Sequence, residues 1–172
     1  PLCNQNTIEI KQMTAKEEDI LTSITLIENG VALERLLESI IVNKTIDPKT
    51  LLVGDRNAIV IAARVSGYGN IYRTQITCPQ CITEQKYNFN LNEAKVTTTT
   101  EIVANLPEAI VVTDTGTYSV TLPKSNLVIE MSLLNGNDER ALTDKLSNNK
   151  SDSQKLVTTQ LFHMIKSVNG NS

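Results

Sequence analysis

The sequence is poor in the residue types that most binding and catalytic sites use. Its 172 residues include no Trp, 3% aromatic residues, three Cys and a single His. With so few aromatic rings there is little to stack on bases or sugars, and the core has to be built from Ile, Leu and Val. Three Cys is an odd number at low density, which excludes a disulfide scaffold of the secreted type.

Dense positive charge and long apolar runs are also missing. The formal net charge is −3 and Lys and Arg form no dense run, so we expect no nucleic acid partner. The longest apolar runs, such as 58–63, are far too short to cross a bilayer, and the N-terminus shows no charged-then-apolar signal pattern. We therefore expect no membrane partner and synthesis as a soluble protein inside the cell.

The composition that remains is that of a globular protein, with 40% hydrophobic and 20% charged residues. The length suits one domain, so we predict a single domain over 1–172. Helical and strand-like patterns both occur along the chain. They predict an α+β fold in which amphipathic helices pack on short antiparallel strands.

Several helices are predicted from capping signals and apolar spacing. Alternation over 7–13 predicts a strand, after which Thr14 and Glu17 have the spacing of a capping box for a helix from Ala15. Apolar residues at helical spacing predict amphipathic helices over 30–43 and 156–168.

The middle of the chain is predicted to hold a central helix and two hairpins. Asp47 and Pro48 predict a short helix that ends at Gly54, and Asp55 is the predicted N-cap of a small-residue helix that ends at 67–69. The predicted hairpins pair 70–77 with 82–91, and 110–113 with 118–122.

The two ends of the chain resemble each other. Residues 8–21 align without a gap with 129–142, matching apolar, acidic and capping positions, and a small shift aligns the next apolar positions. This predicts a pseudo-twofold internal repeat of units 7–43 and 127–169, which enclose a central segment over 47–122. Convergent amphipathic patterning is the alternative explanation.

The motif Cys78-Pro79-Gln80-Cys81 lies between two predicted strands, which makes it a Cys-Pro-x-Cys β-hairpin. Such a turn points two sulfurs at one centre, and a structural zinc site needs four ligands. Cys3 and His163 are the remaining soft ligands in the chain, so an intrachain site of three Cys and one His is arithmetically complete. The alternatives to bound zinc are two reduced thiols that hold a turn, or a local disulfide.

A thiol oxidoreductase is the enzymatic alternative. That chemistry needs the first Cys at a helix N-terminus, where the dipole lowers the thiol pKa, whereas 82–91 alternates as a strand. His163, between Phe162 and Met164, has the setting of a core-edge side chain, and Asp55 is explained as an N-cap. No nucleophile, base and orienting group can be assembled, so we expect no catalytic residues and no enzyme.

The order of these elements resembles a known family. The segment 51–69, with Asp55 and Arg56 at the start of its helix, is followed by Tyr72 and the Cys-Pro-x-Cys motif, then by 120–123 and the pair Asp138-Glu139. This arrangement is similar to the baseplate hub protein family of T4-like contractile-tailed bacteriophages. Ile82 departs from it, because Gly is usual after such a knuckle.

The resemblance implies a non-enzymatic structural or assembly component of the hub region of a phage tail baseplate. Such a protein would bind other baseplate or tail proteins, be present in several copies per particle, and enter the virion tail after assembly in the host cytoplasm. We expect subunit contacts at the hairpin tip near Pro79 and at the acidic helix starts, 17–19 and 138–139. A zinc-knuckle adaptor unrelated to tails is the alternative function.

Overall fold

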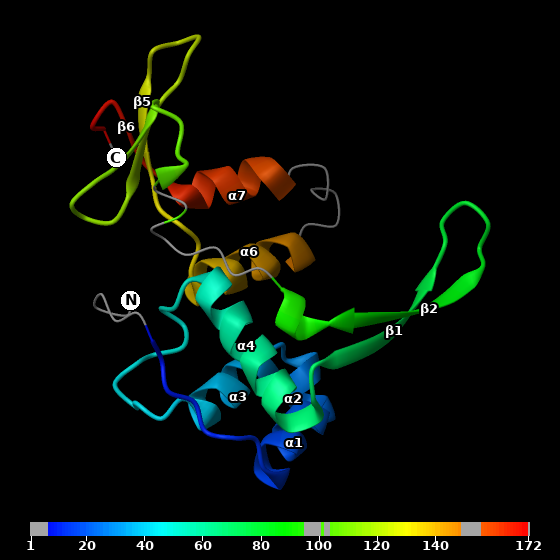
Figure 1. The fold of residues 1–172 in the computed structure, drawn as a ribbon. Helices are drawn as coiled ribbons and strands as arrows, with labels where there is room; N and C mark the ends of the chain where they lie inside the picture. Colours follow the sequence, from blue (N-terminus) through cyan, green and yellow to red (C-terminus); the bar gives the residue numbers. More distant parts are fainter. Residues whose placement is uncertain (1–6, 95–100, 102–103, 149–155, 172) are drawn as a thin grey trace. The chain divides into compact units, whose positions relative to one another are not determined.

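The computed structural model describes residues 7–94, 101, 104–148 and 156–171, and divides the chain into two compact units, 1–96 and 97–172. The described residues form six α-helices and two small antiparallel sheets (Figure 1). The predicted α+β class is therefore confirmed. The boundary between the units falls inside the predicted central segment 47–122, and a single domain over 1–172 stays a prediction.

The first unit is built on four helices: α1 (Ala15–Thr22), α2 (Ile24–Glu28), α3 (Ala32–Ile40) and α4 (Val53–Tyr68). The capping box predicted before α1 is present, with Glu17 accepting a hydrogen bond from the Thr14 N–H at 2.9 Å. The apolar stripe of α3 packs against α4 and forms the core. Its buried members are Leu36, Leu37, Ile40, Ile41, Leu51, Ile59 and Ala63.

The predicted strand over 7–13 is much shorter than expected. It is reduced to one antiparallel bridge between Ile10 and Ile41, flanked by hydrogen bonds from Lys11 N to Ile40 O (2.9 Å) and from Val42 N to Glu9 O (3.0 Å). This bridge also explains why α3 ends at Ile40 and not at residue 43. Ile41 takes an extended conformation that allows the pairing.

The predictions around the start of the central helix were wrong in detail. Asp47 begins a turn, not a helix, and its carbonyl accepts from Thr50 N at 3.1 Å. Helix α4 begins at Val53, so Gly54 lies within the helix and Asp55 is its third residue, not its N-cap. The neighbouring Leu51 is fully buried. Its tertiary packing overrides the local capping signal.

The end of α4 agrees with prediction. The helix stops at Tyr68, and Gly69 follows with φ of 79°, in the left-handed region that favours glycine. The chain then forms β1 (Ile71–Thr77) and β2 (Glu84–Asn90), followed by a short 3-10 helix, η1 (Leu91–Glu93).

The second unit holds a four-stranded antiparallel sheet in the order β3-β4-β5-β6. Its hairpin of β3 (Ile110–Val112) and β4 (Tyr118–Thr121) matches the second predicted hairpin. Strand β5 (Val128–Met131) pairs with β6 (Ile165–Val168), and the helices α6 (Gly136–Asn148) and α7 (Leu156–Met164) lie between them in sequence.

The last predicted helix, 156–168, is too long. Helix α7 ends at Met164, and the next four residues form β6. Pairing with β5 competes with the helical pattern here: Ser132 N donates to Met164 O at 2.9 Å. None of the helices in the described ranges is long and apolar enough to cross a membrane.

Candidate functional site

The two strands of the Cys-bearing segment have one apolar face. Tyr72 pairs with Phe89, and Thr74 pairs with Tyr87. Because strand side chains alternate, Tyr72, Ile76, Tyr87 and Phe89 point to the same side; we call these four the hairpin apolar face. Their side chains are between 43% and 53% exposed, and the rings of Tyr87 and Phe89 meet edge to face with centroids 4.5 Å apart.

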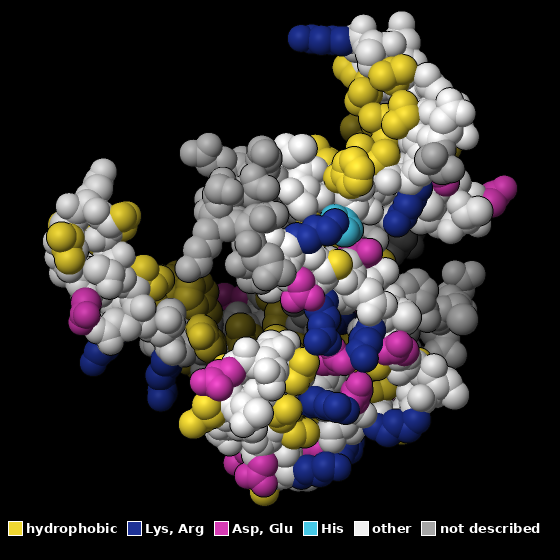
Figure 2. Space-filling model, turned by 180° about the vertical axis from the view of Figure 1, so that it is seen from behind, with side chains coloured by type: hydrophobic (Ala, Val, Ile, Leu, Met, Phe, Trp, Pro, Cys, Tyr) yellow, Lys and Arg dark blue, Asp and Glu magenta, His cyan; other side chains and the backbone are white. Residues whose placement is uncertain are grey.

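The opposite side of the same two strands is mainly polar, with Ile71 as its exposed apolar residue. It carries Arg73 and Gln75 from β1, with Lys86 and Asn88 from β2. The sheet has only these two strands, so both of its edges are free among the described residues. A two-stranded hairpin is marginally stable in water without a third strand or a packed face. Figure 2 shows hydrophobic side chains along this projecting arm.

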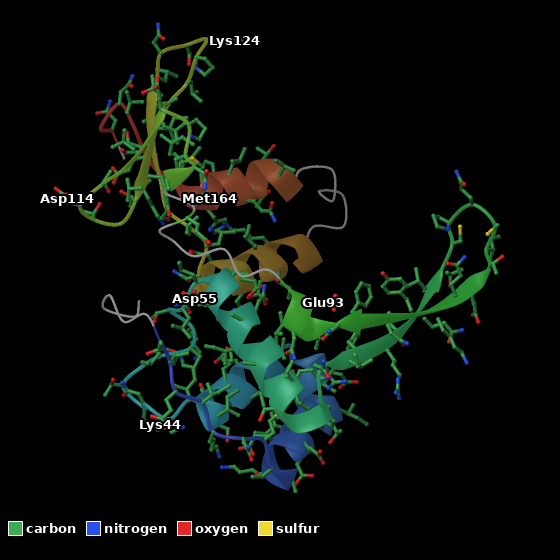
Figure 3. All side chains as sticks on the ribbon, viewed as in Figure 1. Lys44, Asp55, Glu93, Asp114, Lys124 and Met164 are labelled. Atoms are coloured by element: carbon green, nitrogen blue, oxygen red, sulfur yellow. The ribbon has the colours of Figure 1, made fainter. Side chains whose placement is uncertain are left out.

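The connection between β1 and β2 holds both thiols in one turn. Cys78 N donates to Thr83 O (3.0 Å), and Ile82 N donates to Cys78 O (2.9 Å). Cys78 is half-buried, Cys81 is exposed, and both are free thiols. Figure 3 shows sulfur atoms at the far end of the hairpin.

The Cys81 thiol has an altered acidity. Its pKa is lowered, mainly by hydrogen bonding from the Thr83 side chain, with further contributions from the Thr83 backbone and the Cys78 side chain. Both thiols belong to the same short connection, 78–83, which is closed by the two backbone hydrogen bonds above. The turn can therefore present two sulfurs to one ion.

Ile82 carries backbone strain at this turn. Its φ is 55°, in the left-handed region, which a β-branched residue rarely adopts. The Gly expected at this place after a knuckle would adopt that φ without cost. The Ile82 side chain is also 78% exposed, so burial within the described part of the chain does not offset the strain. The unusual residue was visible in the sequence, but its conformation was not.

The other two predicted metal ligands are Cys3 and His163. Cys3 lies outside the described residues, and His163 belongs to α7 in the second unit, where its Nε2 lies 3.0 Å from Lys145 Nζ. No group of three or more metal-ligating side chains occurs within the described ranges. The metal site at Cys78 and Cys81 stays a prediction.

The element that follows the Cys pair is a strand, whereas the thiol oxidoreductase alternative requires a helix there. The chain after Cys81 enters β2, and no helix begins at Cys78. The helix dipole that activates the thiolate in thiol oxidoreductases is therefore not provided by this turn. The charged pair Asp55 and Arg56 lies in the first turn of α4, more than 20 residues before Cys78 in the sequence.

Comparison with protein families gives one match that covers nearly the whole chain. Residues 2–168 match the family described as T4 bacteriophage base plate protein. No curated protein and no solved structure gives a significant match.

Proposed function

The chain belongs to the T4 bacteriophage base plate protein family, and on that premise we propose that it is a non-enzymatic component of the baseplate hub that acts by binding other tail proteins. Membership of the family makes it a structural protein of a phage tail baseplate. The hub location is supported by the order of the Asp55-Arg56 helix, Tyr72 and the Cys pair in the sequence.

The observation that carries the protein-binding proposal is the hairpin apolar face. Its four side chains lie on one face of a two-stranded sheet whose two edges are free among the described residues. Large exposed apolar surfaces on such elements are typical of interaction sites. A partner that covers this face would supply the packing that a two-stranded hairpin lacks.

The strained residue at the tip supports the same conclusion. Ile82 combines a left-handed backbone with an exposed apolar side chain. Strain of this kind persists where a function requires it. An isoleucine that inserts into a pocket of a neighbouring subunit would provide that function, in agreement with the contact expected near Pro79.

A paired-face experiment tests this role. A phage that lacks this protein is complemented with tagged wild type, with Tyr87→Thr/Phe89→Thr on the apolar face, or with Arg73→Thr/Lys86→Thr on the polar face. We expect wild type and the polar-face variant in purified baseplates and tails, and loss of the apolar-face variant. Circular dichroism of each purified protein checks that the fold is kept. Equal incorporation of both variants would contradict the proposal.

The same preparations test the remaining parts of the proposal, which are several copies per particle and retention in the virion after assembly in the host cytoplasm. Quantitative mass spectrometry of finished virions against tail proteins of known copy number gives both answers. A protein that is present in assembly intermediates and missing from virions would act only in assembly.

As a second candidate function we propose a zinc-knuckle adaptor, in which Cys78 and Cys81 supply two of the four zinc ligands. The observation in its favour is that one turn between β1 and β2 holds both free thiols. We expect purified protein to hold close to one zinc per chain or per pair of chains, and Cys81→Ser to lose it. Protein that is free of zinc after growth in zinc-supplemented medium would contradict this proposal.

We also propose that the ends of the chain are duplicated. In both ends the residue that follows a bridge or strand donates its backbone N–H to the last residue of a helix, and a capping carboxylate accepts from the residue three before it. At the helix starts, Thr14 N donates to Glu17 Oε2 (2.9 Å), and Asn135 N donates to Asp138 Oδ2 (3.1 Å). At the helix ends, Lys11 N donates to Ile40 O (2.9 Å), and Ser132 N donates to Met164 O (2.9 Å).

Exchanging the capping residues tests this equivalence. Asn135→Thr/Asp138→Glu puts the first unit's pair at the start of α6, and we expect α6 amides to keep their protection from hydrogen exchange. Asp138→Ala should lower that protection, because a capping side chain is lost. If the exchanged pair is as damaging as Asp138→Ala, the two helix starts are not equivalent.

A further inference from the structure

A groove in the first unit combines a cationic rim with an apolar floor. Its volume is about 680 Å³, and it is lined by residues from α1, α2 and α3 and from the segments beside them. We call it the cationic groove. We call its cationic lining residues the rim and its aliphatic lining residues the floor. The rim residues are Lys11, Lys16, Arg35 and Lys44, and the floor residues are Ile20, Leu26, Ile41 and Val42.

The charge around this groove is opposite in sign to that of the whole chain. Four cationic side chains surround it, against Glu38 on its rim and the buried Glu17 beside Lys11, while the net charge of the protein is −3. Figure 2 shows Lys and Arg side chains gathered over the part of the molecule that holds α1 to α3, with hydrophobic and acidic side chains among them.

Some of these cations remain available for a ligand. Lys11 is paired with Glu17 and Arg35 with Glu38, both at 3.0 Å, and the second pair is exposed, so its strength is small. Lys16 is exposed and has no ion pair with any described residue. The local excess of positive charge is therefore not neutralised by the first unit itself.

Lys44 contributes positive charge to the groove, but its ammonium group has no hydrogen-bond donor left for a ligand. Its Nζ donates to Glu38 O (2.7 Å), Ser39 O (3.2 Å) and Ile41 O (2.7 Å) at the end of α3. All three of its donors are thus used, so it cannot clamp a phosphate directly. It can still attract a carboxylate that lies on the rim, because its charge is unchanged.

The floor determines which kind of anion fits. It is made of aliphatic side chains, from the buried Ile41 to the half-exposed Val42, and includes no aromatic ring. Nucleic acid binding to such a surface would lack base stacking and would leave the aliphatic floor unused. A peptide with aliphatic side chains would cover the floor, and its carboxylates would meet the rim.

We propose that the cationic groove binds an acidic, amphipathic segment of a partner protein, with its apolar side chains on Ile20, Leu26 and Val42 and its carboxylates near Lys16 and Arg35. The inference rests on the proposed function, since it names a second surface, besides the hairpin apolar face, through which this protein binds its neighbours. The hairpin apolar face would bind an apolar surface of a partner, whereas the cationic groove would bind an acidic segment.

Selection from a random library of 12-residue peptides, displayed on yeast and panned against the full chain, tests this inference. We expect the selected peptides to combine Asp or Glu with Leu, Ile or Val. Their dissociation constants, measured by fluorescence anisotropy, should rise about tenfold for Lys16→Glu/Arg35→Gln. They should also rise with salt, and be unchanged for the control Arg73→Thr/Lys86→Thr on the hairpin.

Several results would overturn the inference. They are selected peptides without acidic residues, equal binding to the groove variant, no enrichment at all, or tighter binding of a single-stranded oligonucleotide that the groove variant abolishes. Concentration-dependent dimerisation that Lys16→Glu/Arg35→Gln removes would assign the groove to a second copy. None of these measurements needs a phage tail, so failure here is distinct from failure of the wild-type protein to enter baseplates.

Discussion

Glu17 is a carboxylate that the fold buries completely, so the subunit contact expected at 17–19 was wrong for this residue. Its two oxygens accept hydrogen bonds from the hydroxyls of Ser39 and Thr14, from the Thr14 N–H, and from Lys11 Nζ at 3.0 Å. The bond from Ser39 is the largest cause of a pKa far below the usual range, and burial opposes it only in part. This side chain joins the start of α1 to α3, so its charge is part of the fold.

We predict that Glu17→Gln destabilises the protein by about 2 kcal/mol at pH 7, because the buried hydrogen-bonding network loses the negative charge and an NH2 donor replaces one of its two acceptor oxygens. The pH dependence follows from the lowered pKa. As the pH falls below about 4.3, the unfolded state takes up the proton first, so the stabilisation present at neutral pH is lost progressively toward the folded pKa.

Urea unfolding at pH 7, 4 and 3 measures both effects. The wild type should lose more stability on acidification than Glu17→Gln does. Asp19→Asn, at an exposed position of the same helix, is the matched control and should change little at pH 7. An unchanged urea midpoint for Glu17→Gln would show that the network contributes nothing.

Ile82 gives the second prediction at this scale. Replacing it with Gly removes the steric cost of φ at 55°, and we expect the hairpin to gain about 1 kcal/mol. Hydrogen exchange of the β1 and β2 amides should slow accordingly. Ile76→Gly, at a position in regular strand, should speed the same exchange. Faster exchange in Ile82→Gly would mean that the isoleucine side chain stabilises the free hairpin.

At the scale of elements, the two ends of α4 offer a matched pair of glycines. Gly54 lies in the first turn of the helix and Gly69 follows its last residue with φ of 79°, and an added Cβ would meet no atom within 4 Å at either place. The two sites thus differ in backbone conformation and not in available space. Only the second site requires the freedom of glycine.

We therefore predict opposite signs for the same substitution. Gly54→Ala should stabilise the protein by about 0.5 to 1 kcal/mol through helix propensity, and Gly69→Ala should destabilise it by about 1 kcal/mol through left-handed strain. Thermal unfolding followed by circular dichroism at 222 nm distinguishes them. Equal shifts of the midpoint would show that the conformation at Gly69 is not maintained in solution.

Elements with strong periodicity could be predicted from the sequence, and those decided by pairing could not. The stripe of α3 and the alternation of β1 and β2 each carry their own signal, as does the capping box of α1. In contrast, 165–168 continues a helical pattern and forms β6 because β5 is beside it. The start of α4 was missed for a similar reason, since Leu51 is fixed by burial and not by a cap.

The candidate site divides in the same way. The cysteine spacing and the apolar alternation of Tyr87 and Phe89 were readable from the chain. That Tyr72 lies on the same face as Tyr87 and Phe89 depends on the register of the two strands. The cationic groove gave no sequence signal, because its rim residues are spread from Lys11 to Lys44 and only the packing of three helices assembles them.

For the whole molecule, the buried apolar side chains are distributed very unequally between the units. The first unit contains the entire core cluster, whereas Leu142 is the one buried hydrophobic residue among those described in 97–172. A unit with so little of its own core gains little from hydrophobic burial. Its stability should then depend on the rest of the chain or on baseplate partners.

This imbalance gives a test of the predicted single domain. Leu37 is 1% exposed in the core of the first unit, so Leu37→Ala should cost about 2 to 5 kcal/mol there. In a single cooperative domain, hydrogen exchange of the β4 and β5 amides in the second unit should speed by the same free energy as exchange in α3. Leu33→Ala, at an exposed position of α3, is the control. Unchanged exchange in β4 and β5 would mean that residues 97–172 fold independently of the core that Leu37 occupies.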